Sequence, residues 1–343
     1  MKIRKLLINL FLLISIPSLS QHNTDEFSIL FYNVENLFDT RDDSETSDEE
    51  YTPNGDRYWN YKKLNLKLQN ISKVILSSNG WEMPAIVALS EIENREVLEL
   101  LTKKTPLKSV KYKIIHKESP DPRGIDVALL YDPNRFYPIS YKHYPMLRKS
   151  GTIKKTREIL YVSGIANGQD TVHIFVNHWS SRYSGVLETR EKRNSAAMLL
   201  RQKIDVLFEE YVSPKIVIIG DFNDQPYDKS MLDFLGANKS NDTPVDNELY
   251  NLSYLWRDKK KGTLKYQMQW LVFDQIIVSG TLLNAKRGMR TDPNNATIID
   301  FPFLLEKDEK YGGVKPKRTF YGYSYLGGFS DHLPVLLKLN NVD

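Results

Sequence analysis

The sequence predicts an α/β fold in which packed β-sheets are covered by helices. Strand-like segments rich in β-branched residues recur along the chain, and a few long helical patterns lie between them. Strands and helices do not alternate regularly, which argues against a doubly wound sheet or an α/β barrel. No internal repeat and no long linker divides the chain, so we expect one domain over residues 27–339.

The composition is that of a soluble globular protein. The chain has 343 residues, of which 41% are hydrophobic and 26% are charged, so a sizeable core can form. It contains no cysteine, which excludes disulfides, thiolate metal sites and cysteine nucleophiles.

Residues 1–20 have the pattern of a secretory signal peptide. Three basic residues precede a short apolar run, which ends at Pro17 and is followed by small residues before Gln21. This run is too short to span a bilayer, so we expect cleavage rather than anchoring, and no stable membrane insertion. The mature protein is then exported and is either periplasmic or extracellular. Loss of the segment lowers the net charge from +4 to +1, so the bulk charge shows no strongly basic surface.

The first third of the chain is predicted to hold two strands and two helices. Residues 27–33 and 85–89 are apolar enough for strands. Residues 61–78 repeat apolar side chains at helical spacing, and a second helix includes residues 97–101. The acidic stretch 39–50 contains few apolar residues, so we expect a solvated loop rather than a metal site.

The rest of the chain is predicted to contain one long helix, residues 186–212, and a loop-rich region, residues 291–325. Two strands are expected to pair across the Pro-rich turn at residues 119–124. The predicted strands of this part are 112–116, 125–131, 171–176, 215–219, 273–279 and 333–339.

One of these strands ends in a conspicuous polar cluster. Residues 215–219 are mainly apolar and β-branched, which indicates a strand buried on both faces. Gly220 then allows a turn or a close approach, because it has no Cβ. Asp221 and Asn223 lie two residues apart, so continued strand geometry would direct both side chains to one side. A carboxylate and an amide placed together suit a hard divalent cation or a phosphoryl oxygen.

Six predicted strands end in polar side chains that bind hard cations or transfer protons. A single such residue is more often a turn former, a helix cap or a solvated strand end. The full set is difficult to explain in that way and indicates a catalytic site. Its members are Asn33, Glu91, His178, Asp221 with Asn223, Asp274, and Asp331 with His332.

Five short motifs, in order, resemble those of the endonuclease/exonuclease/phosphatase superfamily, the deoxyribonuclease-I-like metal-dependent phosphodiesterases. A further run from Arg123 to Tyr131 resembles secreted bacterial members. Together these motifs span residues 27–339, and the second has serine where the family usually has glutamine. The motifs are Asn33-Val34-Glu35-Asn36, Ser90-Glu91-Ile92, Asn177-His178-Trp179, Gly220-Asp221-Phe222-Asn223 and Ser330-Asp331-His332.

The resemblance implies a four-layer α/β sandwich, with two packed mixed β-sheets flanked by helices. It also implies a Mg²⁺-dependent phosphoric ester hydrolase, with Mn²⁺ or Ca²⁺ as other options for the cation. Carried over to this chain, Glu91 would be the principal metal ligand, and Asn33 and Asp331 would assist directly or through water. Mg²⁺ in proteins typically uses one or two carboxylates and keeps several waters, so one firm ligand suffices.

The same resemblance implies the catalytic roles. Asp221 and Asn223 would position the attacking water and a phosphoryl oxygen. His332 would act either as the base or as the cation that stabilises developing charge, with Asp274 orienting its ring. His178 would be the second imidazole, on the leaving-group side.

Two questions stay open in the sequence. Asp126 is either a partner of His178 or the ion-pair partner of Arg123. Basic residues and tyrosines after His178 and before Ser330 either face the cleft, where they would contact phosphates and bases, or pair with nearby acids on a solvated surface. For Arg190 and Arg193, those acids would be Glu188 and Glu191. Our candidate substrate contacts are Asn177, Arg182, Arg318 and Tyr321.

The leading hypothesis is an exported Mg²⁺-dependent nuclease, either an endonuclease or an exonuclease, that hydrolyses DNA or RNA. No long apolar hairpin of the membrane-inserting kind is evident, which disfavours a lipid substrate. The alternative is a phosphatase or phosphodiesterase for a small or lipid phosphate, such as an inositol phosphate or sphingomyelin. A non-catalytic exported binding module ranks below both, because the acidic and imidazole residues are present. No protein partner is predicted.

Overall fold

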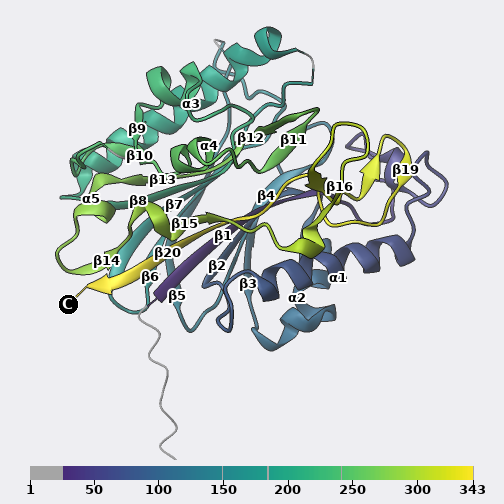
Figure 1. Cartoon of the computed structure of the whole chain (residues 1–343), viewed down its shortest axis with the longest axis horizontal. Helices are drawn as coiled ribbons and strands as arrows, with labels where there is room; N and C mark the ends of the chain where they lie inside the picture. The colour runs from purple at the N-terminus through teal and green to yellow at the C-terminus, as the bar shows by residue number, and fades with distance from the viewer. Residues whose placement is uncertain (1–25, 149, 184, 241, 343) are drawn as a thin grey trace, which may run out of the picture.

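The computed structural model describes residues 26–148, 150–183, 185–240 and 242–342 (Figure 1). The predicted signal peptide lies outside the described residues. Two mixed β-sheets, each of seven strands, pack face to face and helices flank them, so the predicted four-layer sandwich is confirmed. Among the described helices, none is long and apolar enough to cross a membrane.

The first sheet is built around the parallel pair β1 and β2, in which Asn33 lies opposite Ser90. The last strand, β20, runs antiparallel to β1 on its other side, with Val335 opposite Phe31. The strand order is β14 (Gly288–Arg290), β20 (Val335–Val342), β1 (Glu26–Leu37), β2 (Ile86–Ile92), β4 (Asp126–Tyr131) and β3 (Lys113–His116), with β15 (Ala296–Ile298) also paired to β20.

The second sheet has a corresponding parallel pair, β7 and β8, in which His178 lies opposite Asp221. β13 runs antiparallel to β8 and brings Asp274 opposite Asp221. The strand order is β5 (Phe136–Tyr144), β6 (Ile159–Ala166), β7 (Asp170–His178), β8 (Lys215–Asp221), β13 (Asp274–Ser279), β10 (Leu249–Asn251) and β9 (Ala237–Lys239).

Three longer helices lie outside the sheets (Figure 1). α1 (Tyr61–Ser77) and α2 (Arg95–Lys104) accompany the first sheet, and α3 (Val186–Glu210) runs along the second. The side chains of Asn60 and Asn94 accept hydrogen bonds from the first turns of α1 and α2, which fixes where these two helices begin.

The remaining elements are short. The helices are α4 (Tyr254–Asp258), α5 (Gly280–Asn284), the π-helical η3 (Ser230–Phe234), and the 3₁₀ turns η1 (Glu49–Tyr51), η2 (Pro106–Ser109), η4 (Pro293–Asn295) and η5 (Pro302–Leu304). The strands form three hairpins, β11 (Leu264–Tyr266) with β12 (Gln269–Leu271), β16 (Leu305–Lys307) with β17 (Val314–Pro316), and β18 (Phe320–Tyr321) with β19 (Ser324–Tyr325).

β8 shows how the layers are held together. Val217 and Ile219 belong to the core shared by both sheets, whereas Ile216 and Ile218 pack in a second cluster with α3. All four side chains are fully buried, and each contributes about 1.5–3 kcal/mol through the hydrophobic effect. The predicted two-sided burial of this strand is therefore confirmed.

Gly220 allows β7 and β8 to approach each other at their carboxyl ends. A Cβ at position 220 would lie only 2.2 Å from the carbonyl oxygen of Asn177, its partner in the parallel ladder. Any side chain here would force the two strands apart and separate the residues that follow them.

Candidate active site

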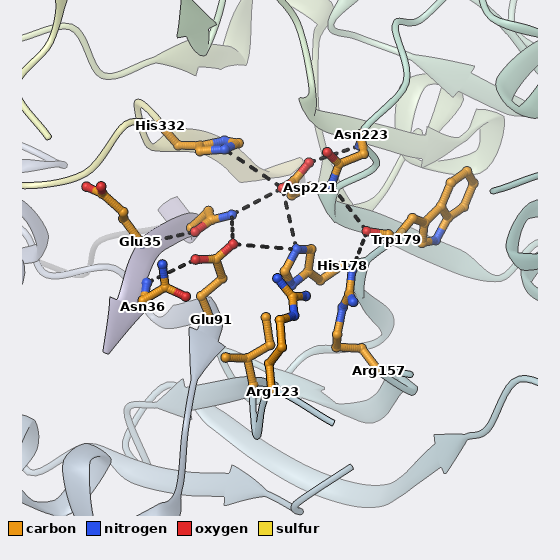
Figure 2. A network of polar contacts seen from close by, with 12 residues as sticks. Glu35, Asn36, Glu91, Arg123, Arg157, His178, Trp179, Asp221, Asn223 and His332 are labelled. Atoms are coloured by element: carbon orange, nitrogen blue, oxygen red, sulfur yellow. Dashed lines mark hydrogen bonds and ion pairs between the residues drawn. The ribbon is translucent and has the colours of Figure 1, made fainter. Parts of the chain in front are cut away.

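The polar residues at the strand ends converge between the two sheets (Figure 2). Asn33 and Glu91 come from the parallel pair of the first sheet, and His178 and Asp221 from the parallel pair of the second. The carboxyl ends of parallel neighbours lie at one edge of a sheet, so each pair delivers two functional side chains to the same place. The face-to-face packing then brings the two pairs together.

Two carboxylate oxygens, Glu91 Oε1 and Asp221 Oδ2, share the same neighbours. Asn33 Nδ2 donates to both, at 3.3 Å and 3.1 Å respectively. His178 Nε2 lies 3.8 Å and 3.7 Å from the same two oxygens. The backbone N–H of Asn36 donates to Glu91 Oε2 at 2.9 Å, which fixes the second oxygen of that carboxylate. Carboxylates from both sheets are thus held facing one point.

Unusual backbone conformations accompany this arrangement. Glu35, Asn36, Glu91 and Asn223 have φ values of 54°, 57°, 63° and 51°. A non-glycine residue in this region costs on the order of 1–3 kcal/mol, so it persists only where the surroundings enforce it. Four such residues around one point indicate a site that is held in place at a cost in stability.

His332 and Asp274 form a buried pair beside Asp221. His332 Nδ1 lies 2.7 Å from Asp274 Oδ2, and His332 Nε2 lies 3.9 Å from Asp221 Oδ2. Burial opposes protonation of His332, but Asp274 and Asp221 outweigh it and raise the pKa of His332 well above its ordinary value. The backbone N–H of His332 donates to Ser330 Oγ, which in turn donates to the carbonyl of Asn33. His332 therefore favours its cationic form, and its backbone is linked through Ser330 to the end of β1.

His178, unlike His332, favours its neutral form. Burial lowers the pKa of His178 well below its ordinary value, and the positive charges of Arg157, Arg123 and His332 lower it further. Both arginines lie beside the imidazole (Figure 2). Its Nδ1 is buried and has no hydrogen-bond partner among the described residues. Two imidazoles with separated pKa values are suited to different roles in one reaction.

Asp221 is buried, and its pKa is shifted towards neutral pH. Burial raises the pKa of Asp221 to about 7, although His332 lowers it. The strand does not continue to Asn223, because the backbone N–H of Asn223 donates to Asp221 Oδ1 at 2.9 Å and closes a tight turn. The Asn223 amide donates to the carbonyl of Trp179 at 3.2 Å, so it is held beside Asp221 (Figure 2).

The site has the donor set for a hard cation. Asp221, Asp274 and His332 offer ligand atoms within 4.8 Å of one another, but a protonated His332 does not ligate a metal. The facing carboxylates of Glu91 and Asp221 are the better match for Mg²⁺. Asn33 points its amide nitrogen at these carboxylates, while its Oδ1 accepts from the N–H of Glu35 at 3.0 Å.

Glu35 has a role that was not predicted from the sequence, although it lies in the first motif. Glu35 is buried and accepts hydrogen bonds from the backbone N–H groups of Thr319 and Phe320, at 2.6 Å and 3.3 Å. Arg318 bridges Glu35 and Asp331, at 3.3 Å and 3.0 Å. The loop that precedes the final motif is therefore bound to the end of β1.

Lys67 was not predicted either. Its ammonium group donates to the carbonyl of Phe329 at 2.8 Å and to the hydroxyl of Thr319. Burial lowers the pKa of Lys67 to about 8. The sequence carried a signal for this role, because Lys67 interrupts the apolar stripe formed by Leu64, Leu68 and Ile71.

The predicted substrate contacts are mostly engaged within the protein. Asn177 is fully buried, and its amide binds the backbone of Phe175 and the indole of Trp179. Arg182 forms ion pairs with Asp224 and Asp228, and Arg318 is the bridge described above. Tyr321 is exposed on the β18–β19 hairpin.

Both interpretations of Asp126 are wrong. Its Oδ2 lies 3.2 Å from His116 Nε2, and its Oδ1 accepts from the N–H of Ser119 at 2.8 Å. Arg123 instead pairs with Asp121, at 3.4 Å. Asp126 therefore closes the β3–β4 connection, since both of its partners lie there.

The suggested pairing of Arg193 with Glu191 is also wrong. Arg193 is 1% exposed and its guanidinium lies 2.7 Å from Asp224, which follows β8. It also donates to Thr189 Oγ1 at 2.6 Å and to the carbonyl of Val186 at 3.1 Å. Arg193 is therefore a buried structural residue rather than part of a solvated helix surface.

Comparisons with known proteins agree with this fold. The model of the Endonuclease/Exonuclease/phosphatase family matches residues 28–341. No protein of curated function matches the chain in sequence.

Several solved structures are similar at low sequence identity. Humanized D. rerio TDP2 with 14 mutations superposes with a TM-score of 0.58 and 15% identity, over 93% of this chain and 100% of that one. The human Nocturnin catalytic domain with bound sulfate gives 0.54 and 13%, over 93% and 95%. A Bacteroides thetaiotaomicron protein of the same family gives 0.52 and 13%, over 92% and 94%. At such identities the likeness establishes the fold.

Proposed function

Because the chain belongs to the endonuclease/exonuclease/phosphatase family, we propose that it is a metal-dependent phosphodiesterase that hydrolyses nucleic acid. The observation that carries this proposal is the pair of facing carboxylates, Glu91 and Asp221, set between a cationic and a neutral imidazole. A D. rerio TDP2 structure, 15% identical to this chain, is complexed with a single-strand DNA product, which supports the choice of nucleic acid.

The cation would be held mainly by Glu91, with Asp331 assisting and Asp221 nearby, and Asn33 would assist by orienting the two carboxylates through its amide nitrogen. When bound, Mg²⁺ supplies a charge that neutralises the phosphoryl oxygens as negative charge develops on them. The shared neighbours of Glu91 Oε1 and Asp221 Oδ2 support this assignment, since they place two carboxylate oxygens around one point.

The protein groups would then divide the proton transfers and charge stabilisation. Asp221 accepts the proton of the attacking water, because its carboxylate faces Glu91 and lies between His178 and His332. Asn223 keeps Asp221 oriented through its backbone N–H. His332, held cationic by Asp274, stabilises the negative charge of the transition state.

Neutral His178 suits the other side of the phosphate. With its proton on Nε2 it donates one hydrogen bond to a phosphoryl or leaving oxygen. Its burial between Glu91 and Asp221 keeps the ring in one orientation.

The proposal is tested by hydrolysis of single-stranded DNA and RNA with Mg²⁺, with Mn²⁺ or Ca²⁺, and with chelator. Activity should require a divalent cation, and His332→Ala should lower turnover by about 10³-fold or more. Asp274→Asn keeps the shape of the pair but removes the charge, and should also lower turnover strongly. His143→Ala, a histidine outside the site, is the matched control. Wild-type turnover in His332→Ala would refute this mechanism.

A lipid phosphate is the second candidate, on one specific observation. Leu147 and Ile153 pair across the β5–β6 hairpin and are 54% and 53% exposed, next to several basic residues. Parallel assays on inositol phosphates and on sphingomyelin vesicles separate this candidate from a nuclease.

Export is a further part of the proposal and rests on the pattern of residues 1–20. We expect the mature chain to begin at Gln21. Mass spectrometry of the protein recovered from the periplasm or the medium tests this. A mature chain that still carries residues 1–20 would contradict it.

A further inference from the structure

A basic pocket of about 660 Å³ is lined in part by Ser180 and Ser181, which follow His178 closely after the end of β7. Its cations come from three separate segments, the turn before β4, the β5–β6 hairpin and the first half of α3. Asp121 is its only acidic lining residue among those described. The basic lining residues are Arg123, Arg148, Lys154, Lys155, Arg157 and Lys192.

Two of these six cations are already engaged. Arg157 is buried and pairs with Asp121 at 2.8 Å, while its other nitrogen donates to the carbonyl of Trp179 at 2.6 Å. Arg123 pairs with the other oxygen of Asp121 at 3.4 Å. These contacts fix the floor of the pocket relative to the strand that carries His178.

The other four cations carry the surplus charge. In the described part of the chain, no side-chain ion pair or hydrogen bond is found for Arg148, Lys154, Lys155 or Lys192. Four unpaired cations around one concave surface repel one another, which is a cost unless an anion binds between them. The pocket volume lies in the range of sites that bind small ligands or parts of larger ones.

The pocket lies beside the candidate active site, because both border the end of β7. A small cavity lined by His178 and Trp179 shares Arg157, Ser180 and Lys192 with the basic pocket. Figure 2 shows Arg123 and Arg157 beside the His178 ring. A strand that runs past His178 could therefore place a second phosphate in the basic pocket.

We propose that this pocket binds the phosphate next to the scissile one, on the His178 side, in a nucleic acid strand. Tyr183, 98% exposed on the pocket lining, offers a face on which the adjoining base can stack. The inference rests on the proposed nuclease function and specifies its substrate: a strand with a second phosphate on one particular side. A flat lipid surface fits less well, because the unpaired cations line a concavity.

The test uses a ladder of substrates and one double variant. The substrates are a dinucleoside monophosphate, which contains only the scissile phosphate, and the same compound with one added phosphate on its 5′ or its 3′ end. For the wild type, the added phosphate should raise kcat/KM by about 10-fold or more on one end only.

The double variant Lys154→Ala/Lys155→Ala should abolish most of that gain, chiefly through a higher KM. The matched control is Lys103→Ala/Lys307→Ala, which removes the same charge from two exposed lysines outside the pocket and should keep the gain. Thermal denaturation of each variant confirms that it is folded. An equal gain in kcat/KM in the wild type and in the pocket variant would overturn the inference. So would a wild type for which neither the 5′ nor the 3′ phosphate raises kcat/KM.

A binding measurement gives a readout that does not depend on turnover. Fluorescence anisotropy of a labelled oligonucleotide with chelator present should show weaker binding to the pocket variant. The slope of log affinity against log salt should become shallower by about one for each phosphate that the variant no longer binds. An unchanged slope counts against the pocket.

Two outcomes separate the pocket from the proposed function. If the wild type hydrolyses none of the substrates with any divalent cation, the nuclease proposal itself fails. If the pocket variant keeps the full gain on the ladder but no longer binds phosphatidylserine vesicles, the cations bind lipid headgroups and the inference is overturned.

Discussion

Two neighbouring residues of α3, Lys192 and Arg193, belong to two basic regions that differ in one respect. Lys192 lines the basic pocket, where four cations have no acidic partner among the described residues. Arg193 belongs to an arginine cluster, in which Arg193 and Arg182 share Asp224, and Arg182 also pairs with Asp228. The positive charge of the basic pocket is available for a ligand, whereas that of the arginine cluster is neutralised by Asp224 and Asp228.

The difference shows that a basic stretch in a sequence does not identify a binding surface. Arg182 and Arg193 follow the His178 motif closely, yet both are engaged by acids that lie after β8. Lys154 and Lys155 have no motif beside them in sequence, but they line the pocket next to His178. The placement of carboxylates from distant segments decides which cations remain free.

The largest expected effect is on the arginine cluster. Arg193→Ala leaves Asp224 buried without one of its partners, and removal of one member of a buried ion pair costs about 3–5 kcal/mol of unfolding free energy. Lys192→Ala, one residue away, should change stability by less than about 0.5 kcal/mol. Urea denaturation of both variants measures the contrast. Equal losses would remove the distinction between the two regions.

A smaller effect is expected for Arg182→Ala. Arg182 donates to the carbonyl of Asn223 at 2.7 Å and pairs with Asp224, so its removal should cost about 1.5–3 kcal/mol. It acts on the site through Asn223, and we therefore expect kcat to fall with little change in KM. The position of Arg182 after His178 suggested instead that it contacts the substrate, and a rise in KM at constant kcat would favour that interpretation.

The smallest effect concerns His173 of β7. Its ring packs on Tyr211 at the carboxyl end of α3 and shares a hydrogen bond with the hydroxyl of Tyr161. Burial lowers the pKa of His173 to about 4. The folded-state pKa lies below the unfolded value of about 6.5, so the unfolded chain binds the proton first and stability falls as the pH drops from 6.5 towards 4. At pH 5.5 the loss is about 1 kcal/mol.

His173→Gln should be less stable than the wild type at pH 7 but should lose less on acidification. Lys192 is exposed and its removal leaves no buried acid unpaired, so Lys192→Ala should keep the wild-type dependence on pH. Denaturation midpoints between pH 7 and pH 5 measure both. Parallel curves for His173→Gln and the wild type would show that another group causes the acid sensitivity.

Much of the fold could be predicted because its central strands have strong local signals. β1, β2, β7, β8, β13 and β20 are apolar runs that end in or begin next to a polar motif. The prediction omits β5 and β6. β5 is an edge strand with exposed positions and with Pro138 at a register shift, and β6 contains Gly164, where a Cβ would lie 2.4 Å from the Phe136 ring.

The members of the site could be predicted, but their connections could not. The polar residues at the strand ends indicated Asp221, Asp274 and His332, and the structure adds that the two carboxylates favour the charged form of His332. The role of Glu35 depends on Thr319, 284 positions away along the chain. Such partners become visible only when the packing of distant segments is known.

The pairing of the first strand with the last one determines when the candidate site is complete. Phe31 lies opposite Val335, and Ser330 Oγ donates to the carbonyl of Asn33. A nascent chain that ends before Ser330 would already contain Glu91, His178 and Asp221, but it would lack His332 and an anchored first motif. Under the proposed function, the protein would therefore be inactive until its last segment has been synthesised, and a polypeptide that loses this segment to a protease would lack a complete candidate site.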